Sequence, residues 1–556
     1  MTPYASEHYT QDERDILRRY VTNLDGPVFA LVNLPEVVRG ALFARYSRSA
    51  KSLRRLFLDE FVGDLDISGD VTLDATVGLK RAEELYRRIF FEYGDDSVAQ
   101  LGGVHLACEQ ASNVLTKVLE WGRLMSYLEQ STRYIPYDTR LSSGRYRYYR
   151  DAEVLDSPLG ARYVGDMDRM FDTYGSLLPK LQSHIARETP NDGSVGDFAY
   201  RQSVRARALD ALRGLLPAAT LSNVGIYGSG QSYEQLCLKM RAHPLPEVRS
   251  YGERVLAELQ KVIPSFLVRV ERPERGGEWV EYISSRREEM DALSARLFGS
   301  DPPEGDAVSG EAQVRLVDFD PLGEDKVVAA MCFPHTELSE AQLVERVSRL
   351  STTERQAILR AYVGERKNRR HRPGRALERT EYRFEIVSDY GAFRDLQRHR
   401  MLTIEWQPLS TTLGYSVPAL LEESGLAGAF AESLERSREL HEALLETLPS
   451  QAVYAVALAF KIRYVLQLNA REAMHLIELR SSAQGHPVYR KIAQEMHRQI
   501  AEVAGHRSIA EMMVHADHDD VGLGRLRAEG RAEERRSANG PDQDGETRPR
   551  GGSVSL

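Results

Sequence analysis

The chain has 556 residues, of which 42% are hydrophobic and 28% charged, and its formal net charge is −9. This composition is typical of a soluble globular protein, and charged residues interrupt every apolar run well before the ~20 residues that a membrane span requires. The negative net charge argues against wholesale binding of nucleic acid. A small phosphorylated molecule is the more plausible partner.

The N-terminal residues and the cysteines suggest a reducing compartment. Residues 1–20, MTPYASEHYTQDERDILRRY, are polar and acidic, whereas a secretory signal begins with basic residues followed by an apolar stretch. We therefore expect a cytoplasmic protein without a membrane-spanning helix. Cys108, Cys237 and Cys332 lack the spacing of a disulfide framework or a zinc site, which predicts buried apolar residues and no bound metal.

Two stretches of unusual composition divide the chain. Residues 299–313, GSDPPEGDAVSGEAQ, are rich in glycine, proline and acidic residues, as exposed linkers are. Residues 523–556 are poor in apolar residues and mixed in charge, which predicts a disordered tail.

Helical periodicity dominates the rest of the chain. Apolar residues recur at spacings of three and four, which predicts helices, in the segments 80–94, 111–129, 246–262, 339–363 and 489–505. Short runs rich in Val, Ile, Phe and Tyr predict strands at 313–320 and 383–390. The expected fold class is α/β or α+β, with helices in the majority.

Comparing the chain with itself indicates a duplication. Placing Arg400 on Arg123, an offset of 277 residues, superimposes VLEWGRLMSYLEQ on DLQRHRMLTIEWQ. Further on, LKMRAHPLPEVRSYGERVLAEL (238–259) resembles IELRSSAQGHPVYRKIAQEMHRQI (477–500) at an offset of 239 residues. We interpret the chain as an N-terminal extension (1–29), a first repeat (30–290) and a second repeat (313–522).

Three short motifs carry residues suited to binding anions. Arg398, His399 and Arg400 surround an imidazole with two permanent cations, which suit a phosphate or a polarised carbonyl, although a solvated helix end has the same composition. The segment EQSTRY (129–134) suits a nucleotide-binding loop or a helix end capped by serine. NAREAMHLIELR (469–480) places two arginines on different sides of one helix. This arrangement suits a helix that contacts a different ligand on each side, and it is equally typical of a charged surface helix.

Together these segments resemble the flavin-dependent thymidylate synthases, whose members carry a motif close to RHRxxSxNExSxRYS, followed by LP, NAR and LR. The second repeat matches at Arg398, His399, Arg400, Thr403, Asn469, Ala470, Arg471 and Arg480. The first repeat matches at Arg123, Ser126, Tyr127, Glu129, Ser131, Arg133, Tyr134, Arg213, Leu216, Pro217 and Arg241. The resemblance therefore covers nearly the whole chain and implies two tandem thymidylate synthase-like domains.

Each repeat departs from the family motif where the other repeat keeps it. After seven intervening residues, Arg123 is followed by Ser131, the motif serine, but Arg400 is followed by Pro408. Conversely, Trp121 and Gly122 occupy the positions of the first Arg and the His of RHR. The first repeat also lacks the NAR motif.

The resemblance implies a composite active site that methylates deoxyuridylate (dUMP), with methylenetetrahydrofolate as one-carbon donor and a flavin (FAD) reduced by NADPH. It implies FAD-binding residues Arg398, His399, Arg400, Asn469 and Arg471. The implied dUMP-binding residues are Arg123, Glu129, Ser131, Arg133 and Arg213. The candidates at the catalytic centre are Arg480 or Arg241, against the uracil carbonyls, and Ser131, which positions the substrate because no base is implied beside it.

Three alternatives remain open at this stage. Because family enzymes are homotetramers with shared sites, a fused pair is expected to dimerise into a pseudo-tetramer that retains activity. The complementary losses also suit a diverged paralogue that binds flavin or nucleotide without catalysis, and the retained RHR and NAR suit a flavin enzyme for another pyrimidine. The basic run RKNRRHRPGR (366–375) suits a nucleic-acid site, a solvated loop or a site for the charges of the cofactor or folate.

Overall fold

The computed structural model describes residue 4 and residues 7–34, 38–39, 42–43, 46, 49–60, 100, 102–191, 193, 196–299 and 312–519. Outside these residues lie the helix expected at 80–94, the tail at 523–556 and all but the ends of the linker at 299–313.

The described residues of the first half form four strands, β1 (Val28–Leu31), β2 (Gly103–Ser112), β3 (Met125–Glu129) and β4 (Leu221–Ser229). Its helices are α1 (Gln11–Tyr20), α3 (Leu53–Glu60), α5 (Leu115–Leu119), α6 (Ala152–Asp156), α7 (Gly160–Glu188), α8 (Asp197–Leu212), η4 (Arg213–Leu215), α9 (Gly230–Arg241), α10 (Pro246–Gln260), α11 (Pro264–Glu271), η5 (Pro273–Gly277) and α12 (Glu278–Phe298).

The second half also contains four strands, β5 (Gln313–Phe319), β6 (Glu381–Asp389), β7 (Thr403–Trp406) and β8 (Lys461–Asn469). Its helices are α13 (Gly323–Cys332), η6 (Phe333–His335), α14 (Glu340–Val347), α15 (Thr352–Val363), η7 (Arg375–Arg379), α16 (Tyr390–Gln397), α17 (Ala419–Glu423), α18 (Ala427–Thr447), η8 (Ala452–Ala455), α19 (Ala470–Arg480), α20 (Pro487–Glu502) and α21 (Arg507–Glu511).

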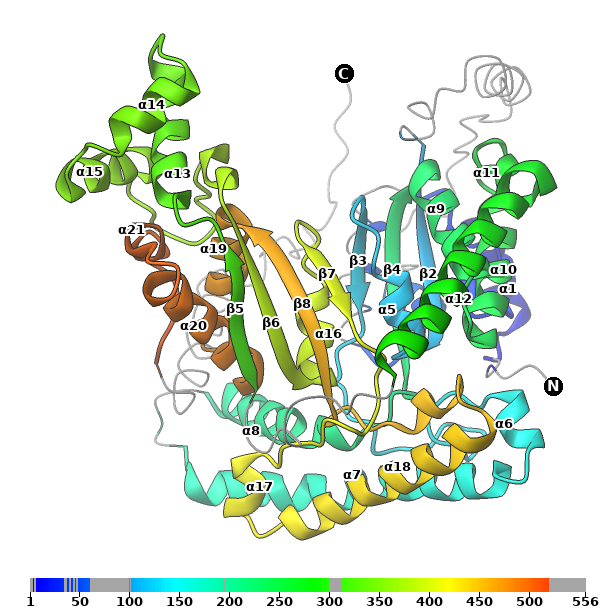
Figure 1. Ribbon diagram of the computed structural model, residues 1–556. Coiled ribbons are helices and arrows are strands. Elements are labelled where there is room, and N and C mark those ends of the chain that lie inside the picture. The colour runs from blue at the N-terminus through cyan, green and yellow to red at the C-terminus, as the bar shows by residue number, and fades with distance from the viewer. Residues whose placement is uncertain are drawn as a thin grey trace, which may run out of the picture.

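The two halves share one sheet topology. Each has a four-stranded antiparallel sheet, ordered β1-β2-β4-β3 in the first half and β5-β6-β8-β7 in the second (Figure 1). If the strands are numbered within each half, the spatial order in both sheets is therefore first, second, fourth, third. Side chains along a strand point alternately to its two faces. In β6, Tyr382, Phe384 and Ile386 point to one face and are fully buried.

Each fourth strand leads directly into a helix through a capping residue. The Ser229 side chain accepts a hydrogen bond from the Ser232 amide at the start of α9, and the Asn469 side chain accepts one from the Glu472 amide at the start of α19. A helix beginning with proline follows in both halves, as α10 and α20. The halves thus repeat a strand, helix, helix unit, which supports a tandem duplication.

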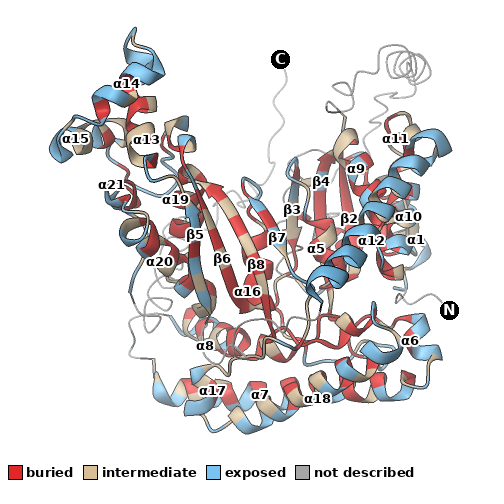
Figure 2. Ribbon diagram, viewed as in Figure 1, coloured by how far each residue is buried: buried red, intermediate tan, exposed pale blue. Residues whose placement is uncertain are grey.

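The halves pack together into a single body. The edge strands β3 and β7 lie beside each other at the centre of Figure 1, and the long helices α7 and α18 run along each other below both sheets. Figure 2 shows buried residues along both sheets, and one hydrophobic core joins them, with Ile226 and Leu466 among its members. Backbone pairing ties the halves as well, since the Ala218 amide donates to the Val456 carbonyl at 2.7 Å and the Leu458 amide to the Leu216 carbonyl at 2.9 Å.

Most of the expected elements are present, but the helix expected at 111–129 is wrong. The strands expected at 313–320 and 383–390 are β5 and β6, and the helices expected at 246–262 and 489–505 are α10 and α20. The segment 339–363 forms two helices, because Ser351 caps a new one. In 111–129, only α5 is helical, and Met125–Glu129 pairs instead with β4, a long-range partner that helical periodicity does not reveal.

Two further expectations concern the membrane and the cysteines. No helix among the described residues combines the length and the apolar character that crossing a membrane requires. Cys108 and Cys237 are buried and Cys332 is half-buried, and all three are free thiols. Burial raises the pKa of the Cys237 thiol to about 12, so this sulfur is an inert core atom.

The junction between the halves yields a stability prediction. Ala457 is fully buried opposite Pro217 of the first half, so Ala457→Leu forces extra carbon atoms into a closed contact. We expect a loss of about 1–3 kcal/mol in the free energy of unfolding, measured by urea denaturation. Ala429→Leu on the exposed side of α18 is the matched control and should change stability by less than about 0.5 kcal/mol. Equal unfolding midpoints for the two variants would contradict a tight junction.

Candidate functional site

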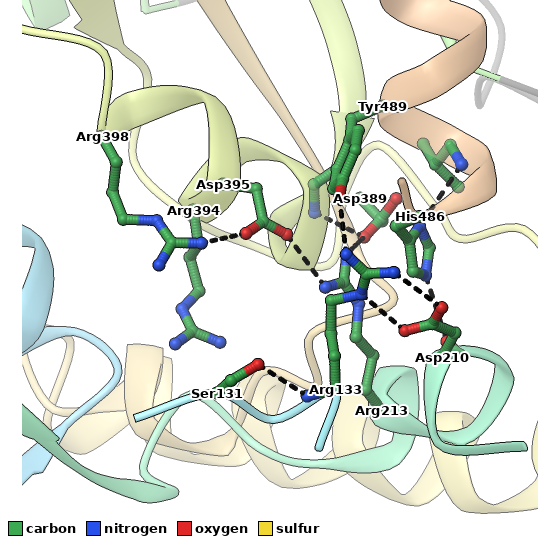
Figure 3. Close-up of polar contacts among 12 residues, drawn as sticks. Ser131, Arg133, Asp210, Arg213, Asp389, Arg394, Asp395, Arg398, His486 and Tyr489 are labelled. Atoms are coloured by element: carbon green, nitrogen blue, oxygen red, sulfur yellow. Dashed lines mark hydrogen bonds and ion pairs between the residues drawn. The ribbon is translucent and has the colours of Figure 1, made fainter. Parts of the chain in front are cut away.

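Asp395 lies at the centre of a cluster of arginines at the junction of the halves (Figure 3). It lies on α16 and pairs with Arg398, the residue that ends this helix. Arg213 of the first half donates from Nη1 to the Asp395 carboxylate at 3.0 Å, and Arg480 donates from Nη2 to its backbone carbonyl at 2.5 Å. Burial opposes ionisation, but the cations prevail and hold the pKa of Asp395 well below its usual range.

Arg133 forms a second closed set of contacts beside this cluster. Its guanidinium binds both carboxylate oxygens of Asp210 on α8, at 2.7 and 2.9 Å. It also donates to the Tyr489 hydroxyl at 2.6 Å and to the Gln484 carbonyl at 2.9 Å, both in the second half. Arg133 and Arg480 both lie over the Tyr489 ring, 5.6 and 5.4 Å from its centroid. One aromatic ring therefore brings together an arginine from each half.

Glu129 and Ser131 lie in the strand and loop that precede Arg133. Glu129 ends β3 and pairs with Arg394 of the second half and, at 3.5 Å, with Lys117. Burial alone would raise its pKa, but Arg394 and Lys117 lower it to about 2. The Ser131 hydroxyl accepts a hydrogen bond from the Arg133 amide at 3.2 Å within a turn, so the alternative of a serine capping a helix is wrong.

His399 is held in one protonation state by its two neighbours. Arg480 donates from Nε to His399 Nε2 at 3.0 Å, and since arginine has no acceptor, Nε2 must be unprotonated. Nδ1 then carries the proton and donates to Glu472 at 2.9 Å. Desolvation lowers the pKa of His399 to about 4, so the imidazole is neutral at pH 7. One ligand atom from each of His399, Glu472 and His475 lies within 4.8 Å of the others, close enough to hold a metal ion.

Asn469 and Arg471, two of the other residues expected to bind FAD, line a small cavity, whereas Arg398 and Arg400 do not. Arg471 donates to the Pro373 carbonyl and to Glu378, each at 3.0 Å, whereas Arg400 crosses to the Met125 carbonyl of the first half. This cavity has a volume of about 60 Å³ and lies between Asn469, Arg471 and His475 on α19 and Arg366, Arg369 and Arg372 of the basic run.

The guanidinium groups and the imidazole of this cavity suit phosphate oxygens, but Glu378, Glu472 and Glu478 line it as well. Its volume is far below the ~300–1,000 Å³ of typical small-molecule pockets. The cavity formed by the described residues of one chain is therefore too small to enclose a molecule of the size of a flavin.

Two residues expected in the site lie apart from the cluster. Arg241 pairs with Glu253 at 2.7 Å and donates to the Val270 carbonyl, all within the first half. Arg123 donates to the Thr403 hydroxyl at 2.9 Å across the junction and is exposed. Of the two candidate catalytic arginines, only Arg480 contacts the residues gathered around Asp395.

Sequence reasoning missed the carboxylates that hold these cations. Asp210 lies three residues before Arg213, Asp395 lies three before Arg398, and Glu472 directly follows Arg471. For Asp210 and Asp395, an acidic residue at helical spacing from a motif arginine was the available signal, whereas Glu472, adjacent to Arg471, has no such spacing. It did not reveal that Asp210 pairs with Arg133 rather than with its helical neighbour.

The neutral state of His399 predicts a pH dependence of stability. A pKa of about 4 in the folded state, below the usual 6.5, means that unfolding takes up a proton between these values, so the stabilisation is lost as the pH falls through this window. His399→Gln should reduce the drop in unfolding free energy between pH 7 and pH 4.5 by about 2–3 kcal/mol in urea titrations. The exposed His335→Gln is the control; equal slopes for both variants would contradict the buried neutral imidazole.

Comparison with known proteins agrees with this geometry. The family model described as thymidylate synthase complementing protein matches residues 45–265 and 315–505, one match in each half. A UPF0159 protein of Chlamydia muridarum is 40% identical over 94% of this chain and 98% of its own. One of Chlamydia pneumoniae is 39% identical (95% and 98%), and one of Thermoplasma acidophilum is 34% identical (88% and 97%). The chain therefore belongs to the thymidylate synthase complementing protein family, the flavin-dependent thymidylate synthases, whose domain it carries twice.

Proposed function

We propose that the protein is a cytoplasmic flavin-dependent thymidylate synthase that methylates dUMP at C5, with methylenetetrahydrofolate as one-carbon donor and NADPH as reductant. One observation carries the proposal. Within one chain, the arginines of the first half that the family motif assigns to the nucleotide, Arg133 and Arg213, meet Arg480 of the second half around Asp395 and Tyr489. The complementary losses of the two repeats thus leave one complete set of motif arginines at the junction.

The charge of this cluster favours an anionic substrate. Four guanidinium groups, those of Arg133, Arg213, Arg398 and Arg480, surround the carboxylates of Asp210 and Asp395. The excess of cations is what a nucleotide phosphate would neutralise, and guanidinium groups bind phosphate in a bidentate manner. In this proposal the phosphate exchanges with a carboxylate at Arg133 or Arg213, and Ser131 positions the substrate.

Arg480 is the residue proposed to face the uracil ring. Burial lowers its pKa, yet an arginine remains protonated at neutral pH. Its Nε and Nη2 are fixed by His399 and Asp395, which aims the guanidinium without reorganisation. A fixed cation beside the uracil carbonyls stabilises the negative charge that develops there.

FAD would be held by Asn469, Arg471 and the Arg398–Arg400 segment, with Arg369 and Arg372 binding its phosphates. The flavin supplies hydride transfer when bound, while the chain supplies orientation and charge. Because the cavity in one chain is small, we propose a homodimer, a pseudo-tetramer of domains, in which a second chain completes each flavin site. The basic run then serves the cofactor rather than nucleic acid.

A second candidate function is nucleotide binding without catalysis. It is favoured by the closed bidentate pair of Arg133 with Asp210, which occupies the guanidinium that the substrate requires. Pro408 in place of the motif serine favours the same reading.

Tritium release from C5-labelled dUMP separates these candidates. With FAD, NADPH and methylenetetrahydrofolate added, we expect release by the purified protein and a visible flavin band that survives desalting. Arg480→Lys should slow release by about 100-fold, because a fixed donor to the developing charge is lost. Arg241→Lys, the matched change at the other candidate arginine, should stay within about twofold of the unaltered protein.

Each outcome assigns the function. A colourless protein that releases no tritium but binds dUMP in equilibrium dialysis would leave only the non-catalytic candidate. Retained flavin with turnover of a different labelled pyrimidine would transfer the proposal to that substrate. Loss of activity in Arg241→Lys and not in Arg480→Lys would reverse the assignment of the catalytic arginine.

A further inference from the structure

The last helix of the first half, α12, packs only one narrow side against the rest of the protein. It has 21 residues and none is buried, although every other described helix of eight or more residues buries at least one. Figure 2 shows it exposed along most of its length. The side that packs is half-buried, and on it Ser284 and Arg287 donate to the Ala242 carbonyl at the end of α9. From residue 288 to Phe298 every residue is exposed.

An adjacent side of α12 carries a stripe of large hydrophobic residues. Successive residues of a helix turn by about 100°, so residues three or four apart lie on one side. Six residues lie within about 80° of one another on this side, and they define the stripe: Trp279, Tyr282, Arg286, Met290, Leu293 and Leu297. The five hydrophobic ones are 38–58% exposed, and the guanidinium of Arg286 lies over the Tyr282 ring. A continuous row of such side chains in water marks an interaction surface.

The stripe coincides with itself when the helix is turned end for end. Its midpoint lies at residue 288, and the reversal places three pairs of positions opposite each other: Trp279 and Leu297, Tyr282 and Leu293, and Arg286 and Met290. A surface of this kind is self-complementary, because the same patch on two copies can pair about a two-fold axis. The geometry of the stripe therefore favours a second copy of α12, running in the opposite direction, as the occupant.

The charges beside the stripe favour the same occupant and direction. Glu278 in the first turn and Arg296 in the last lie on one edge of the stripe, and no described residue forms an ion pair with either. Antiparallel pairing brings Glu278 opposite the partner's Arg296, at both ends of the contact. Glu289, on the same edge, comes opposite the partner's Arg286. Parallel pairing would instead place Glu278 against the partner's Glu278, and like charges repel.

We propose that the chain self-associates through α12, which pairs antiparallel with α12 of a second copy and buries the stripe of both. The aromatic rings of Trp279 and Tyr282 supply the large hydrophobic contacts typical of the centre of an interface. None of the residues assigned to the nucleotide or the flavin takes part. The contact therefore goes beyond the proposed function, and it is separate from the pairing of chains proposed to complete the flavin sites.

Sedimentation velocity of the full chain, without flavin or nucleotide, tests the pairing. We expect an assembly of at least two chains. Leu293→Glu should halve its mass and raise the concentration needed for pairing about 100-fold, because the added carboxylate enters a symmetric contact twice. Ala295→Glu adds the same group on the opposite, exposed side of α12 and should leave the mass unchanged. A monomeric unaltered chain, or equal masses for the two variants, would overturn the proposal.

Charge reversal tests the antiparallel direction. Glu278→Arg and Arg296→Glu should each weaken pairing about tenfold, because each places like charges together at both ends of the contact. The two changes combined in one chain exchange the charges and should restore pairing. A combined variant that pairs no better than the single ones would overturn the antiparallel contact. No turnover is measured, so a failure of the proposed enzymatic function leaves these results intact.

Discussion

Buried guanidinium groups at the junction are the constraint on which the architecture depends. A charge removed from water must find a partner, and a partner that is lost costs several kcal/mol. Here two of the partners come from the opposite half: Arg213 uses Asp395, and Arg394 uses Glu129. Separating the halves would strand these cations. The charged groups of the proposed nucleotide site therefore also hold the halves together.

The two copies of the family domain have diverged at motif positions. In a symmetric pair of identical domains, every residue must serve at two equivalent places. Fusion removes that requirement, and the first copy has Trp121 where the second has Arg398. Trp121 now packs edge-on against Trp406 at 5.1 Å, across the junction between β3 and β7. In the first copy this position is therefore part of the contact between the copies.

Local patterns in the sequence were sufficient to identify the motifs. They were also sufficient to predict elements whose apolar periodicity matched their burial, such as β6 and α20. They failed at Met125–Glu129, where pairing with β4, almost a hundred residues away, decides the conformation. They identified the cations of the site but not the carboxylates Asp210 and Asp395, because a side chain's partner depends on how distant helices pack.

The backbone pairing between residues 216–218 and 456–458 has a consequence for assembly. In a protein built from separate domains, such a contact obeys mass action, and dilution dissolves it. Here both partners belong to one chain, so each domain meets its counterpart at an effective concentration set by the tether rather than by the amount of protein. The arginine cluster at the junction is consequently complete in every folded molecule, however scarce the protein is.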